Sequence, residues 1–170
     1  IVPKDVEFLE GQGLKLEPGQ EGFILYTITV NPPDPDQEPG PLSDKLVRCA
    51  INYALDRDTV VDQALYGAGK RLVQNFPEWS IAYFPELDER YPFDLDEAKE
   101  LLAEAGYPDG GFTLKAIVPT SDPAYEAMAV IHQADLAQLG IDIEIVTLDS
   151  AAYGPEHLGS PETNGSAPFD

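Results

Sequence analysis

Few side chains in this sequence have the types and spacing that catalysis or metal binding requires. The two imidazoles are His132 and His157, and the residue four positions after His132 is a leucine rather than a second ligand. Cys49 has neither histidine near it in the sequence, so no base is at hand to activate its thiol. The sequence also lacks a Gly-x-Ser-x-Gly elbow, a phosphate-binding glycine loop and a dinucleotide fingerprint. We therefore expect no enzyme, metal or cofactor, and we expect His132 to be a surface or half-buried helix side chain.

The best candidates for ligand contact are aromatic and amide side chains in segments that we predict to be loops. Residues 68–92 have no helix or strand period, yet they contain Phe76, Trp79, Tyr83, Phe84 and Tyr91. A loop so rich in aromatic groups must bury them on something. Trp79 and Tyr83 could line a ligand pocket or could cover the domain core. Asn31, where a predicted strand leaves for a proline-rich loop, could cap that turn or face a ligand.

The segments around these loops alternate between strands and helices. A β-branched and aromatic run predicts a buried strand over 23–30. Alternation predicts strands over 112–118 and 141–147, with a helix over 122–139 between them. A helix that connects two neighbouring strands makes them parallel, with a right-handed crossover. Open α/β sheets bind ligands at the loops beyond strand ends. Here those loops are 31–41, 76–84 and 119–122.

Two amphipathic helices have starts and stops that can be read from the sequence. Asp94 is a predicted N-cap, Glu97 completes a capping-box pattern, and Gly106 can adopt the left-handed conformation that ends the helix. Ser43 is the predicted cap of an earlier helix, after which Asp56 caps a further short one. The buried stripes of the two longer helices consist of Leu95, Ala98, Leu101, Leu102 and Ala105, and of Leu46, Val47, Ala50, Ile51, Ala54 and Leu55.

Composition indicates a globular protein that does not bind nucleic acid. The chain has 170 residues, of which 43% are hydrophobic, enough for one domain with its own core. Its formal net charge of −21 repels nucleic acid and anionic membrane surfaces. The charge could attract cationic ligands, but a solvated acidic surface is the simpler interpretation. The sequence has no run of eighteen apolar residues, and its single cysteine excludes an internal disulfide.

Three segments carry motifs in a distinctive order and spacing. Segment 42–58 holds an aspartate, then valine-arginine, then alanine, then alanine-x-aspartate-arginine. Segment 93–111 holds alanine-lysine, leucine-leucine and alanine-glycine-tyrosine-proline, and segment 131–143 holds a helix end, a glycine-isoleucine turn and a strand. Together they resemble the family 5 extracellular solute-binding proteins, which are the peptide, dipeptide and nickel receptors of ABC importers. The resemblance covers residues 20–155, and it departs from the family pattern at Cys49, where glutamine is usual, and at Leu95, where proline is usual.

The resemblance implies a lobe of the periplasmic-binding-protein type II kind, an α/β fold with a mixed sheet flanked by helices. Because family members are several times longer, we expect residues 1–150 to be a single α/β lobe of a two-lobed solute-binding protein. Residues 151–170 would be coil that leads to a missing strand. In peptide-binding members, an aspartate that grips the peptide amino terminus lies beyond that strand, which follows a tyrosine-aspartate pair matched here by Phe169-Asp170.

The resemblance further implies a substrate-binding component of an ABC importer that captures a peptide or a similar small solute by hinge closure. Asn31, Trp79 and Tyr83 would contact the ligand. The partners would be the solute and the membrane-embedded ABC permease subunits. We expect a monomer in the periplasm or at the extracellular face of the cytoplasmic membrane.

Peptide, nickel-chelate and oligosaccharide receptors share these motifs, so the solute stays open. Two other functions are also open. A ligand-sensing domain of a transcription regulator would use the same fold, and an accompanying helix-turn-helix would identify it. A degrading enzyme could have borrowed the fold, but the lack of a nucleophile–base pair argues against it.

Overall fold

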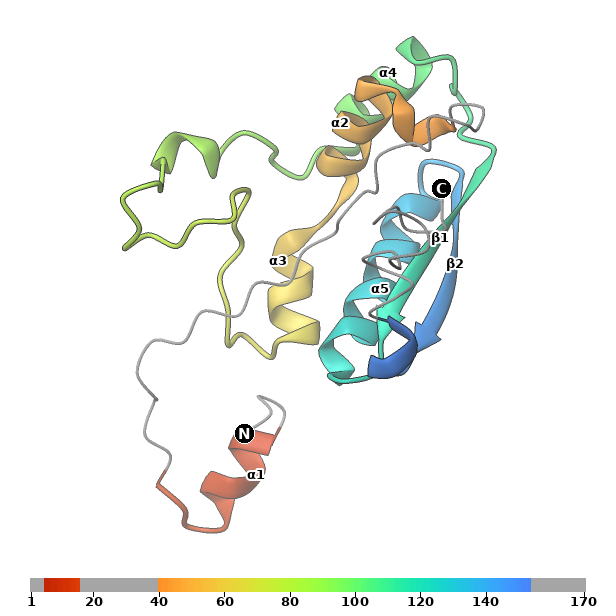
Figure 1. Cartoon of the computed structure of the whole chain (residues 1–170). Helices are drawn as coiled ribbons and strands as arrows, with labels where there is room; N and C mark the ends of the chain where they lie inside the picture. Colours follow the sequence, from red (N-terminus) through yellow and green to blue (C-terminus); the bar gives the residue numbers. More distant parts are fainter. Residues whose placement is uncertain (1–4, 16–39, 154–170) are drawn as a thin grey trace.

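The computed structural model describes residues 5–15 and 40–153 of the chain. In the second range, a helix and a shorter helical segment, a long irregular loop, a second longer helix, and a strand–helix–strand unit follow one another in sequence (Figure 1). The elements, with η marking short helical turns, are α1 (Val6–Gly11), η2 (Pro41–Ser43), α2 (Lys45–Ala54), α3 (Arg57–Thr59), η3 (Val60–Ala64), η4 (Pro85–Leu87), α4 (Leu95–Glu104), β1 (Phe112–Pro119), α5 (Pro123–Ala137) and β2 (Ile141–Leu148).

The predicted parallel β-α-β unit is confirmed. Strands β1 and β2 pair in parallel, with a register that runs from Phe112 opposite Ile141 to Pro119 opposite Leu148. Helix α5 connects the strands and packs against both of them, as Figure 1 shows. It begins where expected, because the Asp122 carboxylate accepts the N–H of Ala124 at 2.9 Å and a proline occupies the first turn.

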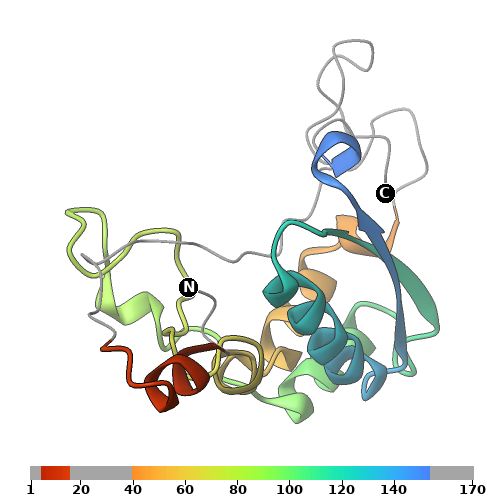
Figure 2. The ribbon, with the colours of Figure 1, turned by 90° about the horizontal axis from the view of Figure 1, so that it is seen from below.

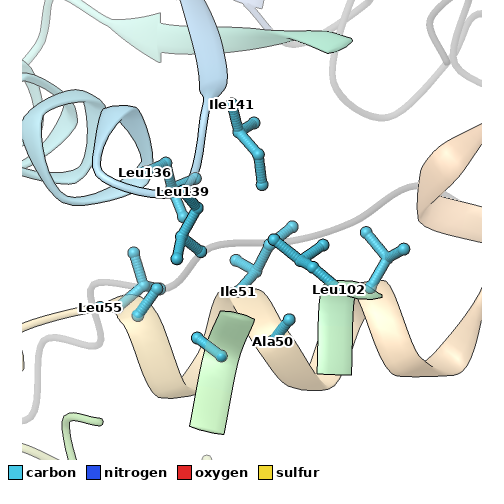
Figure 3. Close-up of a cluster of buried hydrophobic side chains, with 10 residues drawn as sticks. Ala50, Ile51, Leu55, Leu102, Leu136, Leu139 and Ile141 are labelled. Atoms are coloured by element: carbon cyan, nitrogen blue, oxygen red, sulfur yellow. The ribbon is translucent and has the colours of Figure 1, made fainter. Parts of the chain in front are cut away.

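The main apolar core joins α2 and α4 to the end of the β-α-β unit at which α5 passes into β2. The side chains of this core point toward one another in Figure 3. Its buried members are Val47, Ala50, Ile51, Ala54, Leu55, Ala98, Leu102, Leu136, Leu139 and Ile141. Leu102 alone, 1% exposed, contributes about 1.5–3 kcal/mol by burial. All members of the two predicted helical stripes except Leu46 therefore belong to this core or pack against it.

A second, smaller core holds the turn after α2 against α5. Val60 and Ala64 of η3 pack on Met128 of α5, with Ile131 partly buried beside them. The segment that leads into the 68–92 loop is therefore held against the β-α-β unit by apolar contacts, in addition to the covalent connection through the chain.

Two helix caps differ in detail from the expectation. The cap of α2 is Asp44, whose carboxylate accepts the N–H of Leu46 at 2.7 Å, and not Ser43. Ser43 is the last residue of a short turn that Pro41 begins, and its hydroxyl donates to Gly40 O. Because that turn already uses Ser43, the next residue with an extended backbone becomes the cap.

At the start of α4, Asp94 is the cap as predicted. Its carboxylate accepts the N–H groups of Asp96 and Glu97, each at 3.0 Å. Its own N–H, which a capping box would satisfy with the Glu97 side chain, donates instead to Tyr53 O at 2.9 Å. The start of α4 is thereby bonded to the end of α2.

The described residues contain one sheet, made of the two parallel strands β1 and β2. The strand predicted over 23–30 lies outside these residues, so the mixed sheet stays a prediction. Over the described ranges, the structure has no helix long and apolar enough to cross a membrane.

Candidate functional site

The candidate site is the long loop between η3 and α4, residues 68–92, here called the aromatic loop. In both Figure 1 and Figure 2 this yellow-green segment extends away from the β-α-β unit, on the far side of α3. It has only one short helical turn of its own, η4. Its shape must therefore come from turns and side-chain hydrogen bonds.

The aromatic loop exposes most of its large apolar side chains. Trp79 is 70% exposed, Ile81 is fully exposed, and Phe76 and Phe84 are each about half exposed. The expectation that the loop buries its aromatic groups is wrong for these positions. We call Phe76, Trp79, Ile81 and Phe84 the apolar tip. Four large exposed apolar groups within nine residues make this loop a candidate for contact with another molecule.

A buried amide holds the loop in shape. Gln74 donates from Nε2 to Phe84 O at 2.9 Å and accepts the N–H of Phe84 on Oε1 at 3.0 Å. Its Nε2 also lies 3.2 Å from a carboxylate oxygen of Asp88. One side chain thus satisfies both backbone groups of Phe84, as a neighbouring strand would.

Two further contacts close the loop. The hydroxyl of Tyr83 donates to the Asp88 carboxylate, and Lys70 forms an ion pair with Glu78. The bond to Asp88 is the main reason why the pKa of Tyr83 is raised to about 12. The pKa of Asp88 is lowered: burial opposes ionisation, but the hydrogen bonds from Tyr83 and Gln74 outweigh it. At neutral pH, therefore, Tyr83 is a donor and Asp88 a charged acceptor.

The structure thus places the predicted ligand-contacting residues differently. Trp79 lies in the exposed tip, where its ring is accessible. Tyr83 is half-buried, and its hydroxyl is engaged with Asp88. Asn31, like His157, lies outside the described residues.

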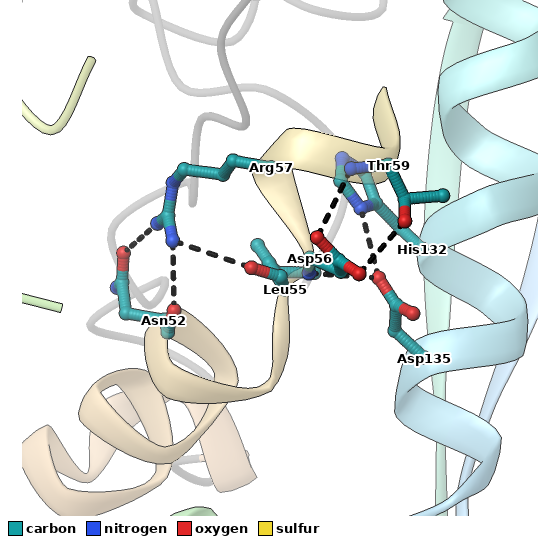
Figure 4. Close-up of polar contacts among 7 residues, drawn as sticks. All are labelled: Asn52, Leu55, Asp56, Arg57, Thr59, His132 and Asp135. Atoms are coloured by element: carbon teal, nitrogen blue, oxygen red, sulfur yellow. Dashed lines mark hydrogen bonds and ion pairs between the residues drawn. The ribbon is translucent and has the colours of Figure 1, made fainter. Parts of the chain in front are cut away.

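Sequence reasoning missed a polar cluster at the break between α2 and α3, shown in Figure 4. His132 and Asp135 on α5 are both buried, so the expectation of a surface or half-buried histidine is wrong. Asp135 accepts the N–H of Asp56 at 3.1 Å, and the Asp56 carboxylate caps α3 through Thr59. The signal in the sequence was a histidine and an aspartate three residues apart on an otherwise apolar helix face.

Beside this cluster, Arg57 is bonded to neutral groups. Its guanidinium donates to the backbone oxygen of Asn52 at 2.9 Å and to the Asn52 side-chain oxygen at 2.8 Å. Asp56 and Arg57 are part of the alanine-x-aspartate-arginine motif. In this structure the motif residues make hydrogen bonds within the chain: they fix how α2 gives way to α3.

The described part of the chain shows no constellation for metal binding or nucleophilic chemistry. Among these residues, no group of three or more His, Cys, Asp or Glu side chains is placed to hold a metal ion. Cys49 is half-buried, and its Sγ lies 3.8 Å from the Tyr91 hydroxyl. The features that remain are a braced loop and its exposed apolar tip.

Comparison with known proteins gives a consistent result. Residues 1–164 match the family described as bacterial extracellular solute-binding proteins, family 5, middle region. The chain is 35% identical over 137 residues to heme-binding protein A of Haemophilus influenzae, covering 79% of this chain and 24% of that protein. It is 32% identical over 161 residues to a dipeptide-binding protein of Pseudomonas aeruginosa, covering 89% and 28%.

Solved structures agree. The Helicobacter pylori periplasmic binding protein DppA in complex with the peptide STSA superposes with a TM-score of 0.61 at 36% identity, covering 67% of this chain and 22% of that one. The oligopeptide-binding protein AppA of Bacillus subtilis, in complex with a nonapeptide, gives 0.60 at 26% identity, covering 66% and 25%. The chain spans about a quarter of the length of these proteins.

Proposed function

This chain belongs to the bacterial extracellular solute-binding proteins of family 5, and from that membership we propose that it forms part of the substrate-binding component of an ABC importer. The solute would be a peptide or a similar small molecule. Relatives named for dipeptides, tripeptides, glutathione and heme support this range. The mechanism would be hinge closure between two lobes, with no covalent step.

The observation that carries the proposed place of solute contact is the apolar tip on a loop held by its own hydrogen bonds. A large rigid ring such as that of Trp79 can cover a ligand side chain at little conformational cost. Because Gln74 and Asp88 fix the loop beforehand, less ordering has to accompany binding. We propose that Trp79 contacts the solute directly.

We propose different roles for the other two predicted ligand-contacting residues, Tyr83 and Asn31. Tyr83 would support the base of the surface with its half-buried ring, since its hydroxyl is already used by Asp88. Asn31 would offer its amide to the solute from the end of the predicted 23–30 strand. The permease subunits would be the membrane partner of a monomeric receptor, in the periplasm or at the extracellular face of the cytoplasmic membrane.

The test is calorimetric titration of di- and tripeptides into a receptor that carries this sequence, with wild-type and Trp79→Ala forms. Loss of a stacking contact should weaken binding by about 2–10-fold, since such contacts contribute about 0.5–1.5 kcal/mol beyond burial. The melting temperature should stay within about 1 °C, because removal of an exposed side chain seldom changes stability by more than about 0.5 kcal/mol.

A matched control is available at Phe8 on α1, a second aromatic side chain that is 67% exposed. Phe8→Ala should leave both the affinity and the melting temperature unchanged. The proposal for Trp79 fails if Trp79→Ala lowers the melting temperature by many degrees while peptide affinity is preserved. Trp79 would then be part of a core and not of the binding surface.

A further inference from the structure

Arg57 carries a charge that its hydrogen-bond partners do not neutralise. Its Nη1 donates to the backbone oxygen of Asn52 at 2.9 Å and to Leu55 O at 3.5 Å, and its Nη2 donates to the Asn52 side-chain oxygen at 2.8 Å. All three acceptors are neutral oxygens. Within residues 5–15 and 40–153, no carboxylate forms an ion pair with this guanidinium. A half-buried cation in a chain of net charge −21 is thus without a counter-ion among the described residues.

The bonds that Arg57 makes leave one edge of its guanidinium open. Because Nη1 donates twice and Nη2 once, the Nε–H and the second N–H of Nη2 have no acceptor in the described part of the chain. These two groups are neighbours on the planar guanidinium, and such a pair can bind both oxygens of one carboxylate. Since Asn52 and Leu55 fix the rest of the group, the open edge is held in place before anything binds to it.

A second guanidinium lies close to the first. Arg71, near the start of the aromatic loop, has its Nε 3.6 Å from a carboxylate oxygen of Asp58, the residue that follows Arg57 in α3. That separation is too long for a hydrogen bond, and 77% of the Asp58 side chain is exposed, so the ion pair is weak. Burial, the larger influence, and the charge of Arg71 together lower the pKa of Arg57. Two cations therefore lie together with one loosely held anion.

Both arginines lie on the side of α3 where the aromatic loop is found. In Figure 4, Arg57 extends away from α5 and from the buried pair His132 and Asp135. The aromatic loop, to which Arg71 belongs, lies on the side of α3 away from α5 in Figures 1 and 2. The cationic pair is therefore on the same side of α3 as the apolar tip.

We propose that Arg57 and Arg71 form a binding site for a carboxylate, and that the solute supplies this carboxylate. Arg57 holds both oxygens on its open edge, and Arg71 contributes the second positive charge. The assignment to the solute rests on the proposed function, because a peptide ends in a free carboxylate. At this site the local charge is opposite in sign to the net charge of the chain, so the site favours a solute with a negative group over a neutral one.

The site itself is tested by NMR on the 170-residue chain, through the arginine Nε–H signals at constant ionic strength. The probe is N-acetylglycine, and the control is its amide, which lacks the negative charge. We expect the Arg57 and Arg71 signals to shift saturably with N-acetylglycine, and the amide to bind at least about tenfold more weakly. The signal of Arg90, an exposed guanidinium that lies over the Tyr91 ring, should not shift.

Two variants should change the affinity in opposite directions. Arg71→Gln removes one positive charge and should weaken N-acetylglycine binding by at least about fivefold. Asp58→Asn removes the carboxylate that competes for Arg71 and should tighten binding by about 2–5-fold. Neither substitution touches the bonds from Arg57 to Asn52, so both variants should fold as the wild type does.

Three results would overturn the carboxylate site. One is an equal response of the arginine signals to N-acetylglycine and to its amide. Another is a shift at Arg90 as large as that at Arg57, which would indicate general screening of an acidic chain. The third is a change of affinity in the same direction in Arg71→Gln and Asp58→Asn.

The source of the carboxylate is tested separately, by calorimetric titration of a dipeptide and its C-terminal amide into a receptor that carries this sequence. The dipeptide should bind at least about tenfold more tightly than the amide, and Arg71→Gln should remove most of that preference. Equal binding of the two, with arginines that still respond to N-acetylglycine, would overturn the assignment to the solute in favour of a carboxylate elsewhere in the receptor. A receptor that binds neither would contradict the proposed function together with that assignment, whereas the NMR result on the site would stand.

Discussion

The glycine that ends α5 should be far less replaceable than the one that ends α4. Both adopt left-handed backbone conformations, with φ of +73° at Gly140 and +90° at Gly106. Around Gly106 a Cβ atom would meet nothing within 4 Å. At Gly140 it would lie 2.2 Å from the carbonyl oxygen of Asp109. The turn that contains Asp109, just before β1, and the turn that contains Gly140, just before β2, are therefore in direct backbone contact.

The expected cost can be worked from these contacts. Alanine in the left-handed conformation costs about 1–2 kcal/mol at either site. At Gly140 the turns must also move apart, which breaks the bond from Gly111 N–H to Gly140 O, 2.8 Å long and worth about 1 kcal/mol. The separation also disturbs Leu139 and Ile141, both buried in the main core. We expect Gly140→Ala to cost about 3–4 kcal/mol and Gly106→Ala about 1–2.

Thermal unfolding followed by far-UV circular dichroism measures the difference. For a chain of this size 1 kcal/mol corresponds to about 2–4 °C, so Gly140→Ala should melt at least about 4 °C below Gly106→Ala. Because both variants pay the same conformational penalty, the comparison isolates the close approach of the two turns. Equal melting temperatures would show that the turns are not in contact, and the steric reasoning would be refuted.

Three further predictions follow from single contacts. Asp94→Ala removes the acceptor of two N–H groups and should cost about 1 kcal/mol by thermal melting, whereas Asp96→Ala, in the same exposed turn, should stay within about 0.5. Leu102→Ala should cost about 2–5 kcal/mol in urea unfolding, because its side chain is fully buried; a smaller value would indicate a loosely packed core. Gln74→Leu leaves both backbone groups of Phe84 without their partner, so amide exchange across the aromatic loop should accelerate while exchange in α5 does not.

Much of the described fold could be predicted because its signals are local. Asp94, Asp122 and Asp56 cap helices where the sequence places them, since capping depends on a residue and its next three neighbours. The parallel pairing of β1 and β2 follows from the helix between them. The one misplaced cap, Ser43, has a cause two residues before it, in the turn that begins at Pro41.

The site could be predicted only in part, because its decisive contacts are not local. The sequence shows that residues 68–92 are rich in aromatic groups, but not that Gln74 closes the loop on Phe84 ten residues later. It shows a histidine and an aspartate on α5, but not that the aspartate meets Asp56. Likewise, Gly106 and Gly140 look equivalent as helix stops, and only the packed turns distinguish them.

The different origins of stability in the core and in the aromatic loop bear on how the loop could serve different solutes. The core is held by apolar burial, so a change of side-chain size there costs several kcal/mol. The loop is held by Gln74, Asp88 and Tyr83, whose hydrogen bonds do not involve the side chains of Trp79 or Ile81. Substitutions at the tip therefore leave the bonds that shape the loop intact. A surface built in this way can change its chemistry without a loss of stability, which would suit the ligand contact that we propose for this loop.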